Sequence, residues 1–190
     1  ATAAADTLAV DDDTLGLDAT ASFADNFTIT TTASADGTAE TTTAYELSVS
    51  SSGAASGLVD TDLNEAVYLF LESGNVVGRA GTDATDAQNG EQVFTVSVAA
   101  NGEVTLDQLR VVKQSDTNSD NETTTLSAAD LITLTRKDTI EDNDGDLRSD
   151  SALIEIGTAM TFADSGPSIA VEATAAADTL AVDDDTLGLD

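Results

Sequence analysis

The first 18 residues of the chain, ATAAADTLAVDDDTLGLD, occur again without a change as the last 18, residues 173–190. Residue 173 corresponds to residue 1, so the repeat period is 172 residues. Periods of roughly 20 to 50 residues are typical of solenoids, whereas a period this long is the size of a whole domain. The repeat therefore predicts a string of separate domains, each with its own core, with a single duplication as the alternative.

The repeat also sets the expected domain limits. We expect residues 1–166 to form one β-sandwich repeat unit and residues 167–190 to form a linker and the start of the next repeat. Residues 1–40 belong to this unit, form a separate sub-domain, or complete a sandwich that is split across the repeat boundary. The start of the chain has neither a basic region nor an apolar core of a leader, so we expect an internal segment of a longer protein.

Apolar and polar residues alternate along much of the chain, which is the period of strands that bury one face. Residues 66–71 are nearly all apolar, which predicts a strand covered on both sides. Clusters of Gly, Asn, Asp and Ser separate these segments at intervals typical of an antiparallel sandwich. We predict an all-β fold, an immunoglobulin-like antiparallel β-sandwich, with the Thr-rich residues 27–43 as an edge hairpin. The alternating apolar positions are Tyr45, Leu47, Val49, Phe94, Val96, Val98, Ile132, Leu134, Ile154 and Ile156.

The composition excludes several functions. The chain contains no Cys, His or Trp, which excludes disulfides, thiolate or imidazole metal sites and catalytic triads built on His. Its 26 Asp and 10 Glu against 6 Lys and Arg give a formal net charge of −30, which repels nucleic acid and anionic lipid. No apolar run approaches the roughly 20 residues of a membrane span, so we expect no membrane insertion. Crowded carboxylates oppose folding unless cations bind, and solubility in salty surroundings is the alternative explanation.

One acidic turn, DNDGD at residues 142–146, has the pattern of a calcium loop. Calcium takes about six to eight oxygen ligands, and alternate residues of a tight turn point toward a common centre. Gly145 allows the positive φ that such a turn needs. The sequence therefore predicts a Ca²⁺ site here, with a solvated acidic turn as the alternative. The candidate ligands are Asp142, Asp144, Asp146, Glu141 and Asp138, with Asp150 nearby.

A second acidic segment has the spacing that opens an EF-hand loop. Asp116, Asn118 and Asp120 supply the D-x-N-x-D pattern and are candidate metal ligands. No Gly follows at the sixth position and no Glu at the twelfth, so a polar loop is the competing interpretation. Residues 60–65 show a comparable but weaker pattern.

A third group of carboxylates lies where one repeat meets the next. Asp11, Asp12 and Asp13 are consecutive, and Asp18 follows closely. Three adjacent carboxylates are unfavourable unless they are exposed or share a cation. Asp164 precedes the only Pro in the chain, at the expected end of the domain. We predict that an inter-repeat Ca²⁺ joins these acidic ends and stiffens the joint.

Five segments from about residue 45 to residue 167 carry a family resemblance. They are VVGR at 76–79, VFTV at 93–96, GEVTLDQ at 102–108, DNDGD at 142–146 and FADSGP at 162–167. In this order and spacing they resemble the extender repeats of large type I-secreted RTX adhesins of Gram-negative bacteria. The resemblance implies calcium-stabilised sandwiches, with Asp142, Asp144, Asp146 and Asp164 as calcium ligands. Two departures are Ser165, where the family often has a second Asp, and the absence of the G-G-x-G-x-D nonapeptide of the RTX β-roll.

Together these features predict a calcium-binding spacer repeat at the bacterial cell surface, outside the cell. Its expected partners are the neighbouring repeats of the same chain, and the chain itself is expected to be a monomer. An adhesive carbohydrate- or protein-binding sandwich is the alternative, although 4% aromatic residues and no Trp leave little surface for stacking on sugar. An enzyme with two catalytic carboxylates is a third interpretation, but a surplus of carboxylates makes any pair uninformative. We expect no enzymatic activity.

Overall fold

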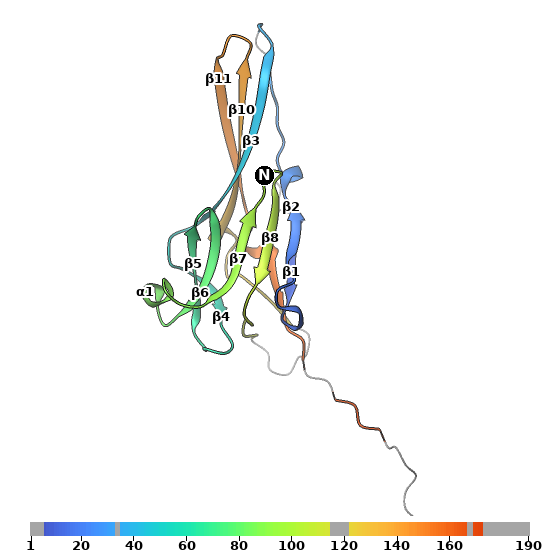
Figure 1. Ribbon diagram of the computed structural model, residues 1–190, viewed down its shortest axis with the longest axis vertical. Helices are drawn as coiled ribbons and strands as arrows, with labels where there is room; N and C mark the ends of the chain where they lie inside the picture. The colour runs from blue at the N-terminus through green and yellow to red at the C-terminus, as the bar shows by residue number, and fades with distance from the viewer. Residues whose placement is uncertain (1–5, 33–34, 115–121, 167–168, 173–190) are drawn as a thin grey trace, which may run out of the picture.

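The computed structural model describes residues 6–32, 35–114, 122–166 and 169–172. Strands make up 52% of the structure and helices 10%, and every described strand pair except one is antiparallel. The molecule is elongated: a sandwich carries a three-stranded arm at one end, and the chain leaves it at the other (Figure 1). The predicted all-β sandwich is confirmed.

One layer of the sandwich is a six-stranded antiparallel sheet. Its buried inward side chains alternate with less buried outward ones, as in β8 (Glu103–Gln108), where Val104, Leu106 and Gln108 are buried. Ser73 and Gly74 form the two-residue turn between β5 (Ala66–Glu72) and β6 (Asn75–Gly81). Their φ angles of 51° and 87° are the left-handed conformation that such a hairpin turn needs. In spatial order the strands are β2 (Ala19–Ser22), β8 (Glu103–Gln108), β7 (Gln92–Val98), β6 (Asn75–Gly81), β5 (Ala66–Glu72) and β4 (Ala54–Val59).

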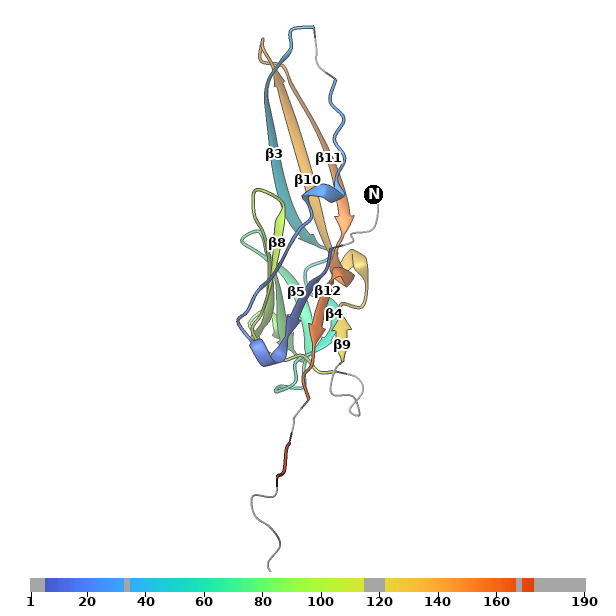
Figure 2. The same ribbon diagram turned by 90° about the vertical axis from the view of Figure 1, so that its right-hand side faces the viewer.

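The opposite layer contains two three-stranded sheets (Figure 2). In the first, β1 (Leu8–Asp11) runs parallel to β12 (Met160–Ala163), which pairs antiparallel with β9 (Thr123–Thr125). The parallel pair places Leu8 opposite Met160 and Asp11 opposite Ala163, so the start and the end of the unit lie side by side. The second sheet has the order β11 (Leu147–Glu155), β10 (Ile132–Asp142) and β3 (Thr38–Val49).

The second of these sheets continues beyond the sandwich as the arm, which comprises residues 38–44, 137–142 and 147–152 with the turn between β10 and β11 (Figure 1). Within the sandwich, Leu47, Leu134 and Ile154 of the same strands are buried. None of the described arm side chains is buried. The same three strands therefore form a core at one end and an exposed ribbon at the other.

The two layers enclose one hydrophobic core. Phe94 of β7 and Phe162 of β12 are fully buried, and their ring centroids are 5.3 Å apart. Leu8, Val10 and Phe23 belong to the same core, so the first strands of the chain pack with the rest of the unit. Every predicted alternating apolar position lies in a strand or directly after one, and none of them is exposed.

One detail of the sequence prediction is wrong. The Thr-rich stretch forms no hairpin, because residues 28–32 lie outside any strand and only Thr38 onward enters β3. Its threonines have strand propensity but no apolar face to bury, so pairing is not enforced there. Residues 66–71 form the predicted strand: Val67 and Leu69 of its inner face are fully buried, and on its outer face Phe70 is buried and Tyr68 is half-buried.

The helical segments are single turns that connect strands. In the described part of the chain, no helix has the length and apolar character to cross a membrane. The described helical segments are η1 (Asp12–Thr14), η2 (Ala24–Asn26), α1 (Ala84–Ala87), η3 (Ala129–Leu131) and η4 (Gly157–Ala159).

Candidate functional site

The turn between β10 and β11, at the tip of the arm, contains the predicted calcium loop. The backbone N–H of Gly145 donates to the carbonyl oxygen of Asp142 at 3.1 Å, and the N–H of Asp146 donates to the Asp142 carboxylate at 2.8 Å. Gly145 has φ of 97°, in the left-handed region that the sequence predicts. The turn is therefore shaped by hydrogen bonds to Asp142 and by the freedom of Gly145.

A turn from a distant part of the sequence lies against this tip. The side-chain amide of Asn143 donates a hydrogen bond to the backbone oxygen of Asp36. As a result, carboxylate oxygens of Asp36, Asp142 and Asp144 all lie within 4.8 Å of one another, and we call these three residues the tip cluster. Asp36 and Asp144 are exposed and Asp142 is half-buried. Such spacing lets three carboxylates share one cation.

The tip cluster has an electrostatic signature of crowded carboxylates. A hydrogen bond and the like charge of Asp142 raise the pKa of Asp144 above its ordinary value. A hydrogen bond between two carboxyl groups requires a proton on one of them. A divalent cation bound between the two groups would offset their repulsion in place of that proton, and both carboxylates would stay ionised.

Other predicted ligands lie just below the tip cluster. Glu141, Asp142 and Asp146 line a hollow of about 310 Å³ together with Arg148. Arg148 is the one basic residue among those that line this hollow. The structure thus brings Glu141 and Asp146 to the same end of the arm as Asp142 and Asp144.

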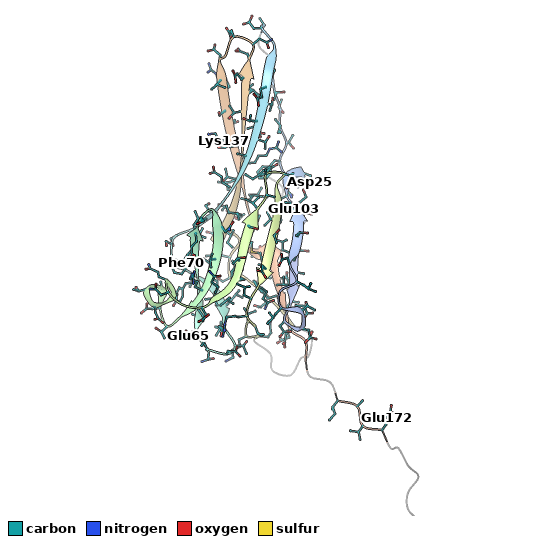
Figure 3. The ribbon with its side chains drawn as sticks, in the orientation of Figure 1. Asp25, Glu65, Phe70, Glu103, Lys137 and Glu172 are labelled. Atoms are coloured by element: carbon teal, nitrogen blue, oxygen red, sulfur yellow. The ribbon has the colours of Figure 1, made fainter. Side chains whose placement is uncertain are left out.

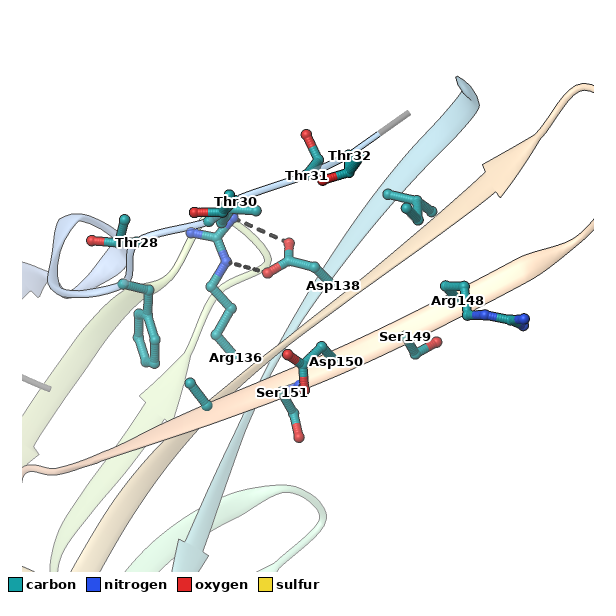
Figure 4. Close-up of a pocket in the computed structure, with 14 residues that line it drawn as sticks. Thr28, Thr30, Thr31, Thr32, Arg136, Asp138, Arg148, Ser149, Asp150 and Ser151 are labelled. Carbon is teal, nitrogen blue, oxygen red and sulfur yellow. Dashed lines mark hydrogen bonds and ion pairs between the residues drawn. The ribbon is translucent and has the colours of Figure 1, made fainter. Parts of the chain in front are cut away.

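Asp138 faces a different environment at the base of the arm (Figure 4). Both of its carboxylate oxygens accept hydrogen bonds from Arg136, at 2.9 and 3.2 Å, and the Thr43 hydroxyl donates to it at 2.6 Å. Burial alone would raise the pKa of Asp138, but the hydrogen bonds from Arg136 and Thr43 outweigh it and lower the pKa. Asp138 therefore neutralises Arg136 and lies apart from the tip cluster.

The same ion pair forms the wall of a groove between residues 28–32 and the face of β10 and β11. The groove has a volume of about 230 Å³ and also contains Arg148 and Asp150. Figure 4 shows the side chains of Thr28 and Thr30 to Thr32 along its opposite wall. Its lining is a mixture of hydroxyl groups, methyl groups and the Arg136–Asp138 pair.

A second group of carboxylates meets at the end of the sandwich where β12 ends. Because β1 and β12 are parallel, Asp11 and Asp12 reach Asp164 and Ser165, more than 150 residues away in sequence. The Ser165 hydroxyl donates to Asp11 and its N–H donates to Asp12, each at 3.1 Å. Burial raises the pKa of Asp12, and the hydrogen bond and charge of Asp164 raise it further. We call Asp11, Asp12 and Asp164 the exit cluster.

The two remaining predicted ligands at this end have different surroundings. Asp13 is exposed and donates its backbone N–H to the Asp11 carboxylate at 3.0 Å. Asp18 lies beside Asp107 of β8, where burial raises the pKa of Asp107 and the charge of Asp18 raises it further. One Asp107 oxygen, Oδ1, is buried and accepts no hydrogen bond in the part of the chain that the structure describes. Asp18 and Asp107 thus form a second crowded pair.

Comparison with protein families places the chain: residues 7–157 match the domain of unknown function DUF5801. The chain belongs to the DUF5801 family. No curated protein and no solved structure matches it.

The matched part of this DUF5801 domain begins one residue before β1 and ends within η4. It contains the whole tip cluster, the Asp18–Asp107 pair, and Asp11 and Asp12 of the exit cluster. Asp164 lies beyond the match. The tip cluster and two of the three residues of the exit cluster therefore lie inside the family domain.

Sequence reasoning missed two carboxylates of the DUF5801 domain that the fold brings into place. Asp36 precedes Gly37 in a turn, which is a weak local signal, and its distance from Asp142 in sequence hides the cluster. Asp107 lies within the quoted segment 102–108, but nothing local indicates its neighbour Asp18. The predicted ligands Asp116, Asn118 and Asp120 lie outside the described residues.

The weaker pattern at residues 60–65 has a structural role in the described part of the chain. Asp60 is fully buried, and its carboxylate accepts hydrogen bonds from Arg110 at 2.6 and 3.2 Å and from the Leu63 N–H at 2.7 Å. Burial would raise the pKa of Asp60, but these hydrogen bonds outweigh it and lower the pKa. Asp60 therefore holds Arg110 against the end of β4.

Proposed function

We propose that this DUF5801 domain is a calcium-stabilised spacer repeat of a bacterial surface adhesin. The array of such units stiffens in calcium and holds a ligand-binding region away from the cell. The observation that carries this proposal is the position of two carboxylate clusters at opposite ends of one elongated unit, at the arm tip and at the exit of the chain (Figure 2). The unchanged repeat of residues 1–18 supports the tandem arrangement.

The path of the chain supports a joint between units. β1 begins near the base of the arm and runs toward the end from which the chain leaves, and Glu172 lies beyond that end (Figure 3). In an array, the arm of each unit therefore extends from its entry point back toward the unit before it. The 12 residues 166–177 precede Asp178, the copy of Asp6, and reach at most ~40 Å when extended. Six residues of an arm strand cover ~20 Å, so the arm lies alongside this connection.

Charge explains why such a joint needs cations. A net charge of −30 makes neighbouring units repel each other, and the exit cluster of one unit faces the tip cluster of the next in this arrangement. Burial and the neighbouring Asp164 raise the pKa of Asp12, and a hydrogen bond and the charge of Asp142 raise the pKa of Asp144. Calcium is suited to these sites because it accepts several carboxylate and carbonyl oxygens in a flexible geometry. Binding of calcium would convert repulsion at the joint into cross-bridging.

The positions of the aromatic residues favour a spacer function over a ligand-binding function. All five Phe and both Tyr lie in the described residues, and each is buried or half-buried. A sugar-binding face usually offers exposed rings for stacking.

Calorimetry with calcium and then with a chelator tests the proposal. A cation that binds only the folded form adds about 2.7 kcal/mol per site at 100 times its dissociation constant. We expect the melting temperature to rise with calcium, and the rise to shrink in the variants Asp142→Asn/Asp144→Asn and Asp12→Asn/Asp164→Asn. The variant Glu46→Gln/Asp130→Asn removes the same charge at exposed positions outside both clusters and should keep the full rise. Equal melting temperatures in calcium and chelator would overturn the proposal.

Small-angle scattering from a protein of several tandem units tests the stiffening separately. We expect a larger and better-defined maximum dimension in calcium than in chelator. A single unit should change little, because its own elongation comes from the arm. An array that is equally compact or equally extended in both buffers contradicts a calcium-dependent joint.

A further inference from the structure

β1 occupies a slot between β12 and the six-stranded sheet. Leu8 is fully buried and Val10 is 4% exposed, and both belong to the common core. The strand packs against β12, β8 and β2. Among the described strands, β1 pairs through its main chain only with β12, with Leu8 opposite Met160. The sandwich is therefore closed by a short segment that enters from one end of the chain.

Polar contacts fix the register of this segment. The Asn26 side-chain amide donates to the Asp6 carboxylate at 2.9 Å, and the Gly16 N–H donates to the Gln108 carbonyl oxygen at 3.3 Å. Ser165 donates to both Asp11 and Asp12. These contacts make the slot specific for the whole segment from residue 6 to residue 16.

The chain contains a second segment with every one of these groups. Residues 178–190 are identical to residues 6–18. The residues equivalent to those that fill and fix the slot are Asp178, Leu180, Val182, Asp183, Asp184 and Gly188.

The second segment can also reach the slot. A parallel strand pair needs a connection of roughly a dozen residues or more. Residues 164–179, which are 16 residues, separate the end of β12 from Leu180. The connection has to return only along the four residues of β12, about 13 Å. The length of the chain therefore permits Leu180 to lie opposite Met160, as Leu8 does.

We propose that the slot beside β12 accepts either copy, so that residues 178–190 of the same chain close the sandwich when residues 6–18 leave it. The unit then has the connectivity of a circular permutant with the same core. In a tandem array, each connecting segment fits two slots, that of its own unit and that of the unit before it. A unit whose first strand is pulled out would keep its core intact.

Substitutions in the full chain test the exchange. Leu8→Asp, Leu180→Asp and the double variant are compared by thermal unfolding, in calcium and in chelator, so that the result is independent of the calcium proposal. We expect Leu180→Asp to be neutral, Leu8→Asp to lose a few degrees, and the double variant to melt at least ~10 °C below Leu8→Asp, because only then is no intact copy left. The matched controls Leu15→Asp and Leu187→Asp change an exposed leucine and its copy and should show no such coupling.

A disulfide shows which copy is in the slot. Ala9 lies opposite Thr161, so Ala181 would lie opposite Thr161 after exchange. Adjacent strands are about 4.8 Å apart, within the range of a disulfide, and the native chain has no Cys to compete. We expect Thr161→Cys/Ala181→Cys to form an intramolecular disulfide in the Leu8→Asp background, as Thr161→Cys/Ala9→Cys does in the native background.

Three outcomes would overturn the inference. One is a Leu8→Asp variant as unstable as the double variant. Another is a Thr161→Cys/Ala181→Cys variant that forms no disulfide in the Leu8→Asp background. The third is a disulfide found only between two chains, with a dimer by light scattering, which would mean exchange between molecules.

Discussion

Strands β3, β10 and β11 run through both the sandwich and the arm, yet the two regions have different sources of stability. In the sandwich, Leu47, Ile132 and Leu134 are at most 4% exposed and pack against the opposite sheet. In the arm, the same strands present Thr, Ser and charged side chains on both faces. The arm depends on its backbone ladder and on cross-strand hydrogen bonds such as Thr139 with Ser149, at 2.7 Å. The three strands thus continue beyond the region in which burial of their side chains in the core stabilises them.

The comparison also applies to charge. Inside the sandwich, Asp60 and Arg110 form an ion pair whose carboxylate is fully buried. At the arm tip, the carboxylates are grouped with one another and remain accessible. The sandwich uses charge to satisfy a buried group, whereas the tip concentrates charge where a cation can enter. The predictions below test this difference.

Removal of Asp60 should give the largest loss of stability. Asp60→Ala leaves Arg110 without its buried partner, and breaking such a pair costs about 3–5 kcal/mol. The lowered pKa of Asp60 means that its contribution is present above the ordinary value of 3.8 and is lost as the pH falls through the lower folded value. Urea unfolding at pH 7 measures the loss. Asp62→Ala, at an exposed carboxylate 3.3 Å from Arg110, should cost less than about 1 kcal/mol.

Truncation of one leucine in the sandwich and one in the arm should cause very different losses of stability. Leu134→Ala opens a cavity among fully buried side chains and should cost about 2–5 kcal/mol. Leu147→Ala, at the far end of the arm where the leucine is 56% exposed, should change stability by less than about 0.5 kcal/mol. Equal effects in denaturant unfolding would show that the arm is packed against something else.

The sequence predicted the sandwich well because burial of one strand face requires an alternating pattern. Phe94, Val96 and Val98 of β7 carry this pattern, and they face the core as expected. The arm carries no such signal, because Thr, Ser and charged residues occur on both of its faces and its few large apolar residues, Ile140 and Leu147, are not buried. The parallel pairing of β1 with β12 was also hidden, because pairing between the two ends of a unit leaves no local trace.

The candidate sites divide in the same way. The turn at residues 142–146 could be predicted, because its Gly145 and alternating Asp are local features. The partners of these carboxylates could not, because Asp36 reaches Asp142 only through the fold. Asp138 is close to the turn in sequence, but the alternation of β10 and the reach of Arg136 place it in the groove.

Substitution of Arg136 should weaken the base of the arm by an intermediate amount. Its guanidinium binds both oxygens of Asp138 and lies 5.5 Å from the centre of the Tyr45 ring. Arg136→Ala should cost about 1–2 kcal/mol, and Arg136→Lys less, because lysine keeps the charge but not the fork of two N–H donors. Hydrogen exchange should show faster opening of arm amides than of β7 amides. Uniform acceleration across both regions would contradict a local role.

Neutralisation of a crowded carboxylate should give the smallest change, and the change should have the opposite sign. The pKa of Asp107 lies above its ordinary value of 3.8, so the folded state binds the proton more tightly than the unfolded chain does. The native protein therefore loses stability as the pH rises through that folded value, and Asp107→Asn removes the penalty. In chelator at pH 7, Asp107→Asn should be more stable than the native protein by up to about 1 kcal/mol.

The pH dependence of this gain distinguishes repulsion from a packing effect. The gain should fade as the pH drops, and it should vanish below about 3.8, where the native Asp107 is protonated in both states. Asp144→Asn at the exposed arm tip should show the same sign with a smaller change, because solvent screens that pair. If calcium binds at Asp18 and Asp107, the gain should reverse in calcium, because the variant then loses a ligand. Thermal unfolding across pH, with calcium and with chelator, therefore measures two effects at Asp107: the destabilisation caused by repulsion between carboxylates and the stabilisation caused by a bound cation.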